Sequence, residues 1–366
     1  MRSITNSSKR QILFAIALVS LIGLWSIHHF LLSENEVILN IEEERILSGQ
    51  DDLIFSSEDV IYAINAKDFH STRLSNLFDA HSPNWSPEGS QIVYISKANS
   101  FSASEIYIMQ ADGSDKTRLT HNSEFEISPA WSPDGTQIAF AAYLEDFCLC
   151  QNIYIINSNG TGLTRLTNNK IEEGYDVNLA YDDTPIWSPN GRQIVFVRDW
   201  YYDKSKIYII NSDGSNLISL THHLEGDYNP TWSPDGKQIA FASYQDGNGE
   251  IYLANIDDSS QIRLTYDDSD DKYPAWSPDG KQIAFVSYRD GNGEIYVLNL
   301  DSLVQTRLTV NNNDDKYPTW SPDGTRIAFV SEQDRNAEIY VINVNNSDQI
   351  RLASGKRYYR SLSWRP

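Results

Sequence analysis

Short apolar runs, bounded by Gly, Pro, Asn or Asp, recur along the chain in a fixed order. Typical examples are QIAFVS at Gln282–Ser287 and EIYVLN at Glu294–Asn299. Runs of this length with turn residues at both ends predict β-strands, and the segments between them lack a convincing helical period. In the first run large residues (Ile, Phe) alternate with small ones (Ala, Val), so both faces are apolar. A strand of this kind must be covered on both sides.

Tryptophan marks the period of the repeat. It occurs at positions 85, 131, 187, 232, 276, 320 and 364, at intervals of 44 to 56 residues. Each unit contains four predicted strands, beginning with the one that carries the Trp and ending with a strand such as TRLT at Thr306–Thr309. Four antiparallel strands in about 45 residues are typical of a β-propeller blade. We expect the Trp residues to be wedges between blades, where the large face of one sheet meets the small face of the next.

The two ends of the repeat region predict how the ring closes. Before the first complete unit the chain has second, third and fourth strands at Leu53–Ser57, Val60–Asn65 and Thr72–Ser75. After the last unit it has only a first strand at Ser361–Trp364. We therefore predict an all-β fold, a seven-bladed β-propeller of four-stranded antiparallel blades, in which the C-terminal strand completes the N-terminal blade and removes open edges. If Arg45–Asp52 is instead a degenerate first strand, Ser361–Trp364 is an extra strand; a six-bladed ring is the other alternative.

The first residues differ in character from the rest. A basic start (residues 1–10) precedes an apolar run (residues 11–32) of about the length that crosses a bilayer as a helix. The run lacks the A-x-A pattern of a cleavage site, so we expect an uncleaved transmembrane signal-anchor, with a cleaved signal peptide as the alternative. In both cases the basic flank stays inside. We therefore expect a linker at residues 33–50 and an extracytoplasmic propeller at residues 51–366, either periplasmic or at the cell surface.

The formal net charge of −21 narrows the class of partner. Such a surface repels nucleic acid and anionic lipid, and it favours cations or basic peptides. We therefore expect a basic protein or peptide as the partner, no nucleic acid, membrane contact through the N-terminal helix, and a monomer. The chain has two cysteines, Cys148 and Cys150. We expect both to be free thiols, because a C-x-C disulfide would be strained.

In five of the units an acidic residue lies three positions ahead of the Pro that comes shortly before the Trp, whereas the equivalent position before Pro83 is Ala80. The loops concerned lead into the innermost strand of each blade, so we predict a partial ring of carboxylates around one mouth of the central channel. The ring could hold a cation or a basic peptide; alternatively, each acid caps its own turn by accepting backbone N–H bonds. No D-x-D-x-D-G calcium loop is present, so we expect no cofactor, and a cation at the mouth would need ligands from different blades. The predicted ring residues are Glu126, Asp182, Asp227, Asp271 and Asp315.

The longest interval between two Trp residues contains a second candidate. Its connection, Thr167–Pro185, is about ten residues longer than its counterparts and lies at the same end of the ring. Nearby, the segment Arg198–Lys206 adds Trp200, Tyr201 and Tyr202. Long loops on a rigid scaffold often carry function, and aromatic residues are enriched in binding surfaces. We interpret the three aromatic residues as partner-binding; the alternative is that they pack beneath the long loop.

The consensus P-x-W-S-P-D-G-x-x-I-A-F, followed by E-I-Y-V-x-N and R-L-T, resembles the WD40-like propeller repeat of the TolB family over about residues 50–366. It is also similar to the propeller domains of prolyl-oligopeptidase-like peptidases and tricorn-type proteases. The resemblance implies a fold and a habit of binding partners, and it implies no reaction. Since the chain has no G-x-S-x-G elbow, we expect a non-catalytic, membrane-tethered receptor or scaffold. The alternative is a lyase or glycoside hydrolase that uses carboxylates at the channel mouth.

Overall fold

The computed structural model describes residues 52–75, 78–97, 103–122, 125–143, 150–169, 180–200, 204–334, 336–355 and 359–366. The chain divides into two units, Met1–Glu42 and Glu43–Pro366, and every described residue belongs to the second. The predicted signal-anchor (residues 11–32) and linker (residues 33–50) lie outside the described residues and stay predictions. Within the described part of the chain, no helix is long and apolar enough to cross a membrane.

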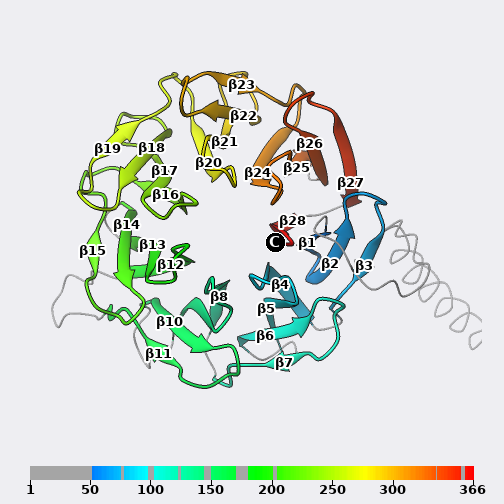
Figure 1. Ribbon diagram of the computed structural model, residues 1–366, viewed down its shortest axis with the longest axis vertical. Helices are drawn as coiled ribbons and strands as arrows, with labels where there is room; N and C mark the ends of the chain where they lie inside the picture. The colour runs from blue at the N-terminus through cyan, green and yellow to red at the C-terminus, as the bar shows by residue number, and fades with distance from the viewer. Residues whose placement is uncertain are drawn as a thin grey trace, which may run out of the picture. The chain divides into compact units, whose positions relative to one another are not determined.

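Seven antiparallel four-stranded sheets form blades around a common axis (Figure 1). In blades 2 to 4 the strands run in chain order from the centre outward (Figure 1). Blade 2 consists of β4 (Phe78–Trp85), β5 (Gln91–Lys97), β6 (Ser104–Gln110) and β7 (Thr117–Arg118). Blade 3 consists of β8 (Glu126–Trp131), β9 (Gln137–Ala142), β10 (Asn152–Asn157) and β11 (Thr164–Arg165). Blade 4 consists of β12 (Ala180–Trp187), β13 (Gln193–Trp200), β14 (Lys206–Asn211) and β15 (Ile218–Ser219).

Blades 5 to 7 follow the same order. Blade 5 consists of β16 (Asp227–Trp232), β17 (Gln238–Ser243), β18 (Glu250–Asn255) and β19 (Gln261–Arg263). Blade 6 consists of β20 (Asp271–Trp276), β21 (Gln282–Ser287), β22 (Glu294–Asn299) and β23 (Gln305–Arg307). Blade 7 consists of β24 (Asp314–Trp320), β25 (Arg326–Gln333), β26 (Asn336–Asn343) and β27 (Gln349–Gly355).

Blade 1 is built from both ends of the described chain. Its order is β28 (Tyr359–Trp364), β1 (Asp52–Ser57), β2 (Val60–Asn65) and β3 (Ser71–Arg73). The C-terminal β28 pairs antiparallel with β1 as the innermost strand, so the tail of the chain closes the ring. The prediction of seven blades with a split blade is confirmed. The six-bladed alternative is wrong, because seven sheets form. The alternative of a first strand at Arg45–Asp52 is also wrong, because β28 is the first strand of blade 1.

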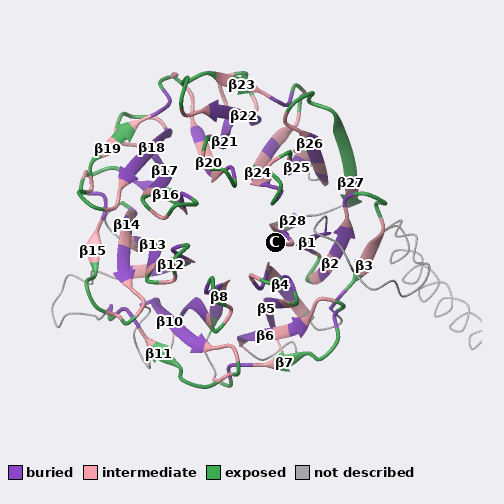
Figure 2. Cartoon of the chain, viewed as in Figure 1, coloured by how far each residue is buried: buried purple, intermediate pink, exposed green. Residues whose placement is uncertain are grey.

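The hydrophobic core is divided into clusters that lie between neighbouring blades. Between blades 6 and 7, Ala284 and Val286 of β21 pack against Ile327 and Phe329 of β25. The small face of one sheet thus meets the large face of the next, as predicted. Figure 2 shows that the buried residues follow the second and third strands of the blades, while the outermost segments are largely exposed. Trp320 belongs to the same cluster, and its indole N–H donates to the Ala275 carbonyl of blade 6 at 3.0 Å. The predicted wedge role of the repeated Trp is therefore confirmed.

Replacing a wedge should destabilise the fold by the loss of both burial and packing. For Trp320→Ala we expect the free energy of unfolding to fall by about 3–5 kcal/mol, because a large cavity would remain between two blades. Urea denaturation followed by circular dichroism measures the change. Leu303→Ala is the control, since the Leu303 side chain is 61% exposed and its loss should change stability by about 0.5 kcal/mol at most. Equal effects of the two substitutions would contradict the wedge role.

Each innermost strand contains a bulge at a non-glycine residue of positive φ, and β4 has a second such residue, Asp79. In blade 6 the pairing of β20 with β21 shifts between Lys272 and Ala275, and Tyr273 lies between them at φ 56°. A non-glycine residue in the left-handed region is uncommon, and its presence in every innermost strand marks a structural feature of the repeat. The bulge breaks the two-residue alternation of the strand. The seven residues, with φ of 52° to 57°, are Ser82, Ser128, Thr184, Asn229, Tyr273, Tyr317 and Ser361.

Candidate functional site

The five acidic residues predicted to ring the channel mouth are buried. Each lies in the first half of an innermost strand and has 0% exposed surface; they are Glu126, Asp182, Asp227, Asp271 and Asp315. The backbone explains their position. The main-chain N–H of Asp271 donates to the Gly249 carbonyl at 2.7 Å, and that of Asp315 to the Gly293 carbonyl at 2.8 Å, so each strand start is joined to the preceding blade. These residues therefore form the joints between blades, and none of them has surface open to a partner in this structure.

The joint between blades 3 and 4 contains a complete ion pair. Arg198 donates from Nε and Nη2 to the two carboxylate oxygens of Asp182, at 2.5 and 2.8 Å. Two parallel charge-assisted bonds offset much of the cost of burying both charges. The Arg198 guanidinium also lies 5.9 Å from the ring centre of Trp200. Trp200 is half-buried, and its predicted binding role stays a prediction.

Other parts of this candidate region lie outside the described residues. Tyr201 and Tyr202 are not described, and neither are residues 170–179 of the long connection. Cys150 is disulfide-bonded, so the expectation of a free thiol is wrong for this residue. Cys148 lies outside the described residues. The structure therefore leaves the predicted binding role of Tyr201 and Tyr202 untested.

At two joints the acid accepts a hydrogen bond from the side-chain amide of an Asn four residues earlier. Asn122 Nδ2 donates to Glu126 at 2.7 Å, and Asn311 Nδ2 donates to Asp315 at 2.7 Å. A neutral amide replaces only part of the solvation that a carboxylate loses on burial. Burial therefore raises the pKa of Glu126 to about 7 and that of Asp315 to about 6. Both bonds come from side-chain amides of the preceding loop, whereas the structural alternative had each acid accept backbone N–H groups of its own turn.

Ser, His and Asp side chains meet at the joint between blades 4 and 5. His223 Nε2 lies 3.3 Å from Asp227 Oδ1 and 3.5 Å from Ser243 Oγ. In a hydrolase triad the acid orients one ring nitrogen while the other activates the serine. Here both contacts fall on the same nitrogen, and Ser243 is fully buried. This arrangement therefore lacks the geometry of an activated nucleophile.

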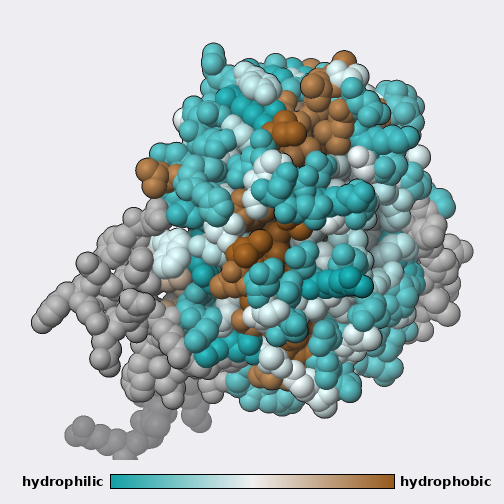
Figure 3. Space-filling model, turned by 60° about the vertical axis from the view of Figure 1, so that its left-hand side comes forward, coloured by the Kyte–Doolittle hydropathy of each residue, from teal (hydrophilic) through white to brown (hydrophobic). Residues whose placement is uncertain are grey.

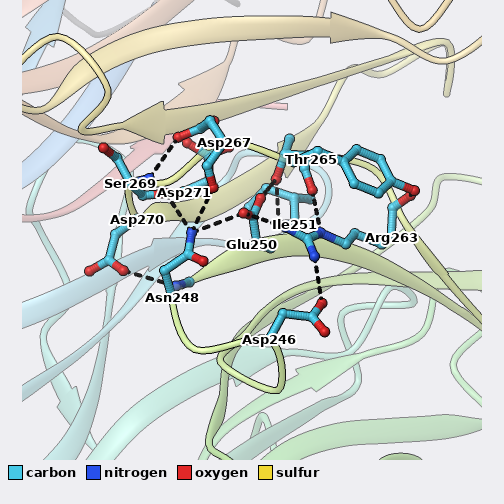
Figure 4. Close-up of polar contacts among 12 residues, drawn as sticks. Asp246, Asn248, Glu250, Ile251, Arg263, Thr265, Asp267, Ser269, Asp270 and Asp271 are labelled. Carbon is cyan, nitrogen blue, oxygen red and sulfur yellow. Dashed lines mark hydrogen bonds and ion pairs between the residues drawn. The ribbon is translucent and has the colours of Figure 1, made fainter.

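Three carboxylates converge at the joint between blades 5 and 6 (Figure 4). One oxygen each from Glu250, Asp267 and Asp271 lie within 4.8 Å of one another, which is the chemistry of a cation site. Positive charge is already supplied by the protein, however. Arg263 Nη2 lies 2.7 Å from Glu250, and Arg289 Nη2 lies 2.6 Å from Asp267 and 3.2 Å from Asp271. Burial, and then the neighbouring charge of Asp267, raise the pKa of Asp271 to about 7.

Glu250 also belongs to a repeated contact that sequence reasoning missed. Thr265 Oγ1 donates to Glu250 at 2.6 Å and accepts the main-chain N–H of Ile251 at 2.9 Å, as Figure 4 shows. Blade 6 repeats the contact, with Thr309 donating to Glu294 at 2.5 Å. The clamp joins the third strand of a blade to the end of its fourth. Its signal was present in the sequence, because these units combine E-I-Y with R-L-T.

Exposed apolar side chains gather where fourth strands lead into the next blade. Leu224, Tyr266 and Val310 lie in these loops and are 78%, 70% and 74% exposed. All such loops lie at one end of the ring, because the strands of each blade alternate in direction. Figure 3 shows apolar areas, in brown, on a mostly hydrophilic surface. We define the loop-end patch as these three residues together with Phe125, Tyr228 and Tyr317, which are also exposed at this end.

The comparisons with known proteins agree with the architecture. The family model for the TolB β-propeller domain (PD40) matches residues 81–199, 177–274 and 269–366. TolB from Acinetobacter baumannii is 20% identical with a TM-score of 0.56, and the match covers 86% of this chain and 81% of that one. An oligogalacturonate lyase in complex with manganese is 16% identical with a TM-score of 0.65, covering 81% and 87%.

A further solved structure comes from an enzyme with additional chain. The puromycin-hydrolyzing peptidase of Mycobacterium tuberculosis is 14% identical with a TM-score of 0.64, and the match covers 84% of this chain but 53% of the peptidase. No curated protein matches the sequence. Likeness at this level of identity shows the fold alone. The family model, by contrast, covers well over half of the chain in three successive matches. The chain therefore belongs to the family of TolB β-propeller (PD40) domains.

Proposed function

We propose that the protein is a non-catalytic, membrane-tethered propeller that binds a protein or peptide partner through the loop-end patch. The observation that carries this proposal is the exposure of Leu224, Tyr266 and Val310 in equivalent loops of three successive joints. Large apolar side chains held on a rigid ring supply a preformed contact surface, and burying them favours association. The loop-end patch takes over the role that the sequence assigned to the carboxylate ring.

The charge around the patch defines the class of partner. Glu225 directly follows Leu224, and Asp268 lies two residues after Tyr266; both acids are exposed. With a net charge of −21, this end of the ring should attract a basic chain, while the apolar side chains provide short-range contact. We therefore propose a partner segment that combines basic and apolar residues. The five joint acids contribute through the fold and not through contact, because none of them has exposed surface.

The proposal includes the location that the sequence predicts. The basic start and the apolar run of residues 11–32 support a membrane anchor with the propeller on the extracytoplasmic side. A lyase or glycosidase that used the predicted carboxylates would need them open to substrate. Their burial removes that basis, so we favour binding over catalysis.

The test is capture of envelope proteins by the full-length chain. We expect the triple substitution Leu224→Ser, Tyr266→Ser and Val310→Ser to reduce capture of the principal partner at least tenfold, since three apolar contacts would be lost. Quantitative mass spectrometry of the captured proteins measures the change. Thermal unfolding of the variant should stay within a few degrees of the parent protein, because the replaced side chains are mostly exposed.

A matched control tests whether apolar exposure alone causes capture. The control carries three Ser substitutions of exposed Leu residues at the outer side of the blades. If control and patch variant lose the partner equally, the loop-end patch is not the site; unchanged capture by the patch variant would contradict the proposal directly. The control positions are Leu163, Leu217 and Leu303, which are 49%, 41% and 61% exposed.

A further inference from the structure

The outermost strand of blade 7 differs from those of the other six blades. β27 has seven residues, whereas the outermost strands of the other blades have two or three. It pairs with β26 on one side and ends the sheet order on the other. Figure 2 shows β27 as a long, largely exposed ribbon at the rim of the ring. Long edges of this kind present free backbone donors and acceptors, which proteins usually avoid by keeping edge strands short.

The register identifies which backbone groups of β27 point outward. The main-chain N–H of Asn343 donates to the Asp348 carbonyl, so 343 and 348 are a hydrogen-bonded pair. Hydrogen-bonded and non-bonded pairs alternate along an antiparallel ladder, and Val341 opposite Ile350 is therefore the next bonded pair. It follows that the N–H and C=O groups of Gln349 and Arg351 face away from β26. Within the described residues, no strand pairs with this edge.

β27 carries one charged side chain, that of Arg351, in a chain of net charge −21. The Arg351 side chain is 57% exposed, and its ion pair with Glu338, at 2.9 Å, is largely open to solvent. An exposed pair of this kind contributes little and can be shared with a second carboxylate.

We propose that the outer edge of β27 binds an extended, acidic peptide segment of a partner protein, which adds a fifth strand to blade 7. The outward groups of Gln349 and Arg351 would supply the main-chain hydrogen bonds, as in other cases of strand addition. The Arg351 guanidinium would pair with a carboxylate on the incoming strand. This surface lies on the rim of the ring and is separate from the loop-end patch. If the β27 edge does not bind such a peptide, the proposed function of the loop-end patch is unaffected.

The test uses the full-length chain and two synthetic peptides. The acidic probe is acetyl-Glu-Val-Glu-Val-Glu-Val-Glu-amide, and the charge control has Lys in place of Glu. We expect the acidic probe alone to bind in fluorescence anisotropy, and to slow hydrogen–deuterium exchange in fragments covering Gln349–Gly355. Exchange in the short strand β23 should not change. Binding without protection of β27, or equal binding of the Lys probe, would overturn the proposal.

Two variants separate backbone pairing from charge. Arg351→Pro removes an outward N–H and leaves the inward ladder intact, a change that edge strands tolerate. It should weaken binding of the acidic probe at least tenfold. Arg351→Ala keeps the N–H and should weaken binding of the probe less. Gln305→Pro, at the equivalent of Gln349 in β23, is the matched control and should have no effect. Equal affinity of the parent and Arg351→Pro proteins would overturn the proposal, and the exchange experiment on the parent protein decides the matter if that variant does not fold.

Protection of β27 from hydrogen–deuterium exchange in the absence of any peptide would also overturn the proposal. If the protection is independent of protein concentration, another segment of this chain covers the edge. If it appears only at high concentration, together with a dimer in light scattering, a second copy does.

Discussion

A chain truncated before Tyr359 is expected to lose roughly 5 kcal/mol or more of its free energy of unfolding, a large part of the total for a domain. The truncation removes β28, which is the innermost strand of blade 1 and joins the two ends of the propeller by strand pairing. Leu53 and Phe55 of β1 would lose the cover of Tyr359 and Trp364, and two strand edges would open. Urea denaturation followed by near-ultraviolet circular dichroism measures the loss.

Two further experiments make this prediction specific. Deleting Pro366 alone should leave stability unchanged, because this residue is exposed and follows the last strand. Adding a synthetic peptide of Tyr359–Pro366 to the truncated chain should restore part of the lost stability, since the missing strand can pair with β1 from solution. If the truncated chain unfolds at the same urea concentration as the parent, closure by β28 does not hold the ring together.

The fold could be predicted from the sequence because its main determinants are local and repeated. A strand apolar on both faces needs neighbours on both sides, and a Trp in each unit sets the spacing of the blades. The closure followed from counting the strands before Trp85 and after the last complete unit. The loop-end patch was harder to find, because its residues share no single position in the repeat: Tyr266 and Val310 directly follow the R-L-T motif, whereas Leu224 lies three residues after S-L-T. Exposure of a single apolar residue has no signature in one sequence.

The burial of the joint acids could not be predicted for a physical reason. Strict alternation would place Asp271 and Tyr273 on the same side of β20. The bulge at Tyr273 interrupts the alternation, so Asp271 is fully buried while Lys272 and Tyr273 are only half-buried. A positive φ at a Tyr is not suggested by the residue itself. It is imposed by the packing of one blade against the next, which a single sequence does not display.

We expect the free energy of unfolding to fall by several kcal/mol as the pH rises from about 4 to about 7. Burial raises the pKa of Glu126 and Asp271 to about 7 and that of Asp315 to about 6, from about 4 in the unfolded chain. Between these values the folded state binds more protons than the unfolded state, so raising the pH favours unfolding. One pKa unit corresponds to about 1.4 kcal/mol. Thermal unfolding between pH 4 and pH 8 should give the highest Tm near the acidic end of this range.

The turn aspartates limit the effect at lower pH. A hydrogen bond from the Ser two residues earlier lowers the pKa of Asp134, Asp235 and Asp279. Groups of this kind stabilise the folded state above their unfolded pKa, and the stabilisation is lost as the pH falls through their folded pKa. Stability should therefore decrease again below about pH 4. The turn aspartates and the joint carboxylates together predict a maximum of stability in acid. It should lie between the pH at which the turn aspartates titrate and the pH at which the joint carboxylates do.

Substitution at the joints distinguishes this origin from a general effect of net charge. Asp315→Asn keeps a side chain that can accept the bond from Asn311 and removes the buried charge. It should raise the Tm at pH 8, leave it nearly unchanged at pH 4.5, and flatten the dependence between them. Asp182→Asn is the opposite case, since it leaves the Arg198 charge buried without its partner and should cost about 3–5 kcal/mol across this range. If both substitutions act alike, or if Asp315→Asn preserves the full slope with pH, the joint carboxylates do not titrate near neutrality and the dependence must arise elsewhere.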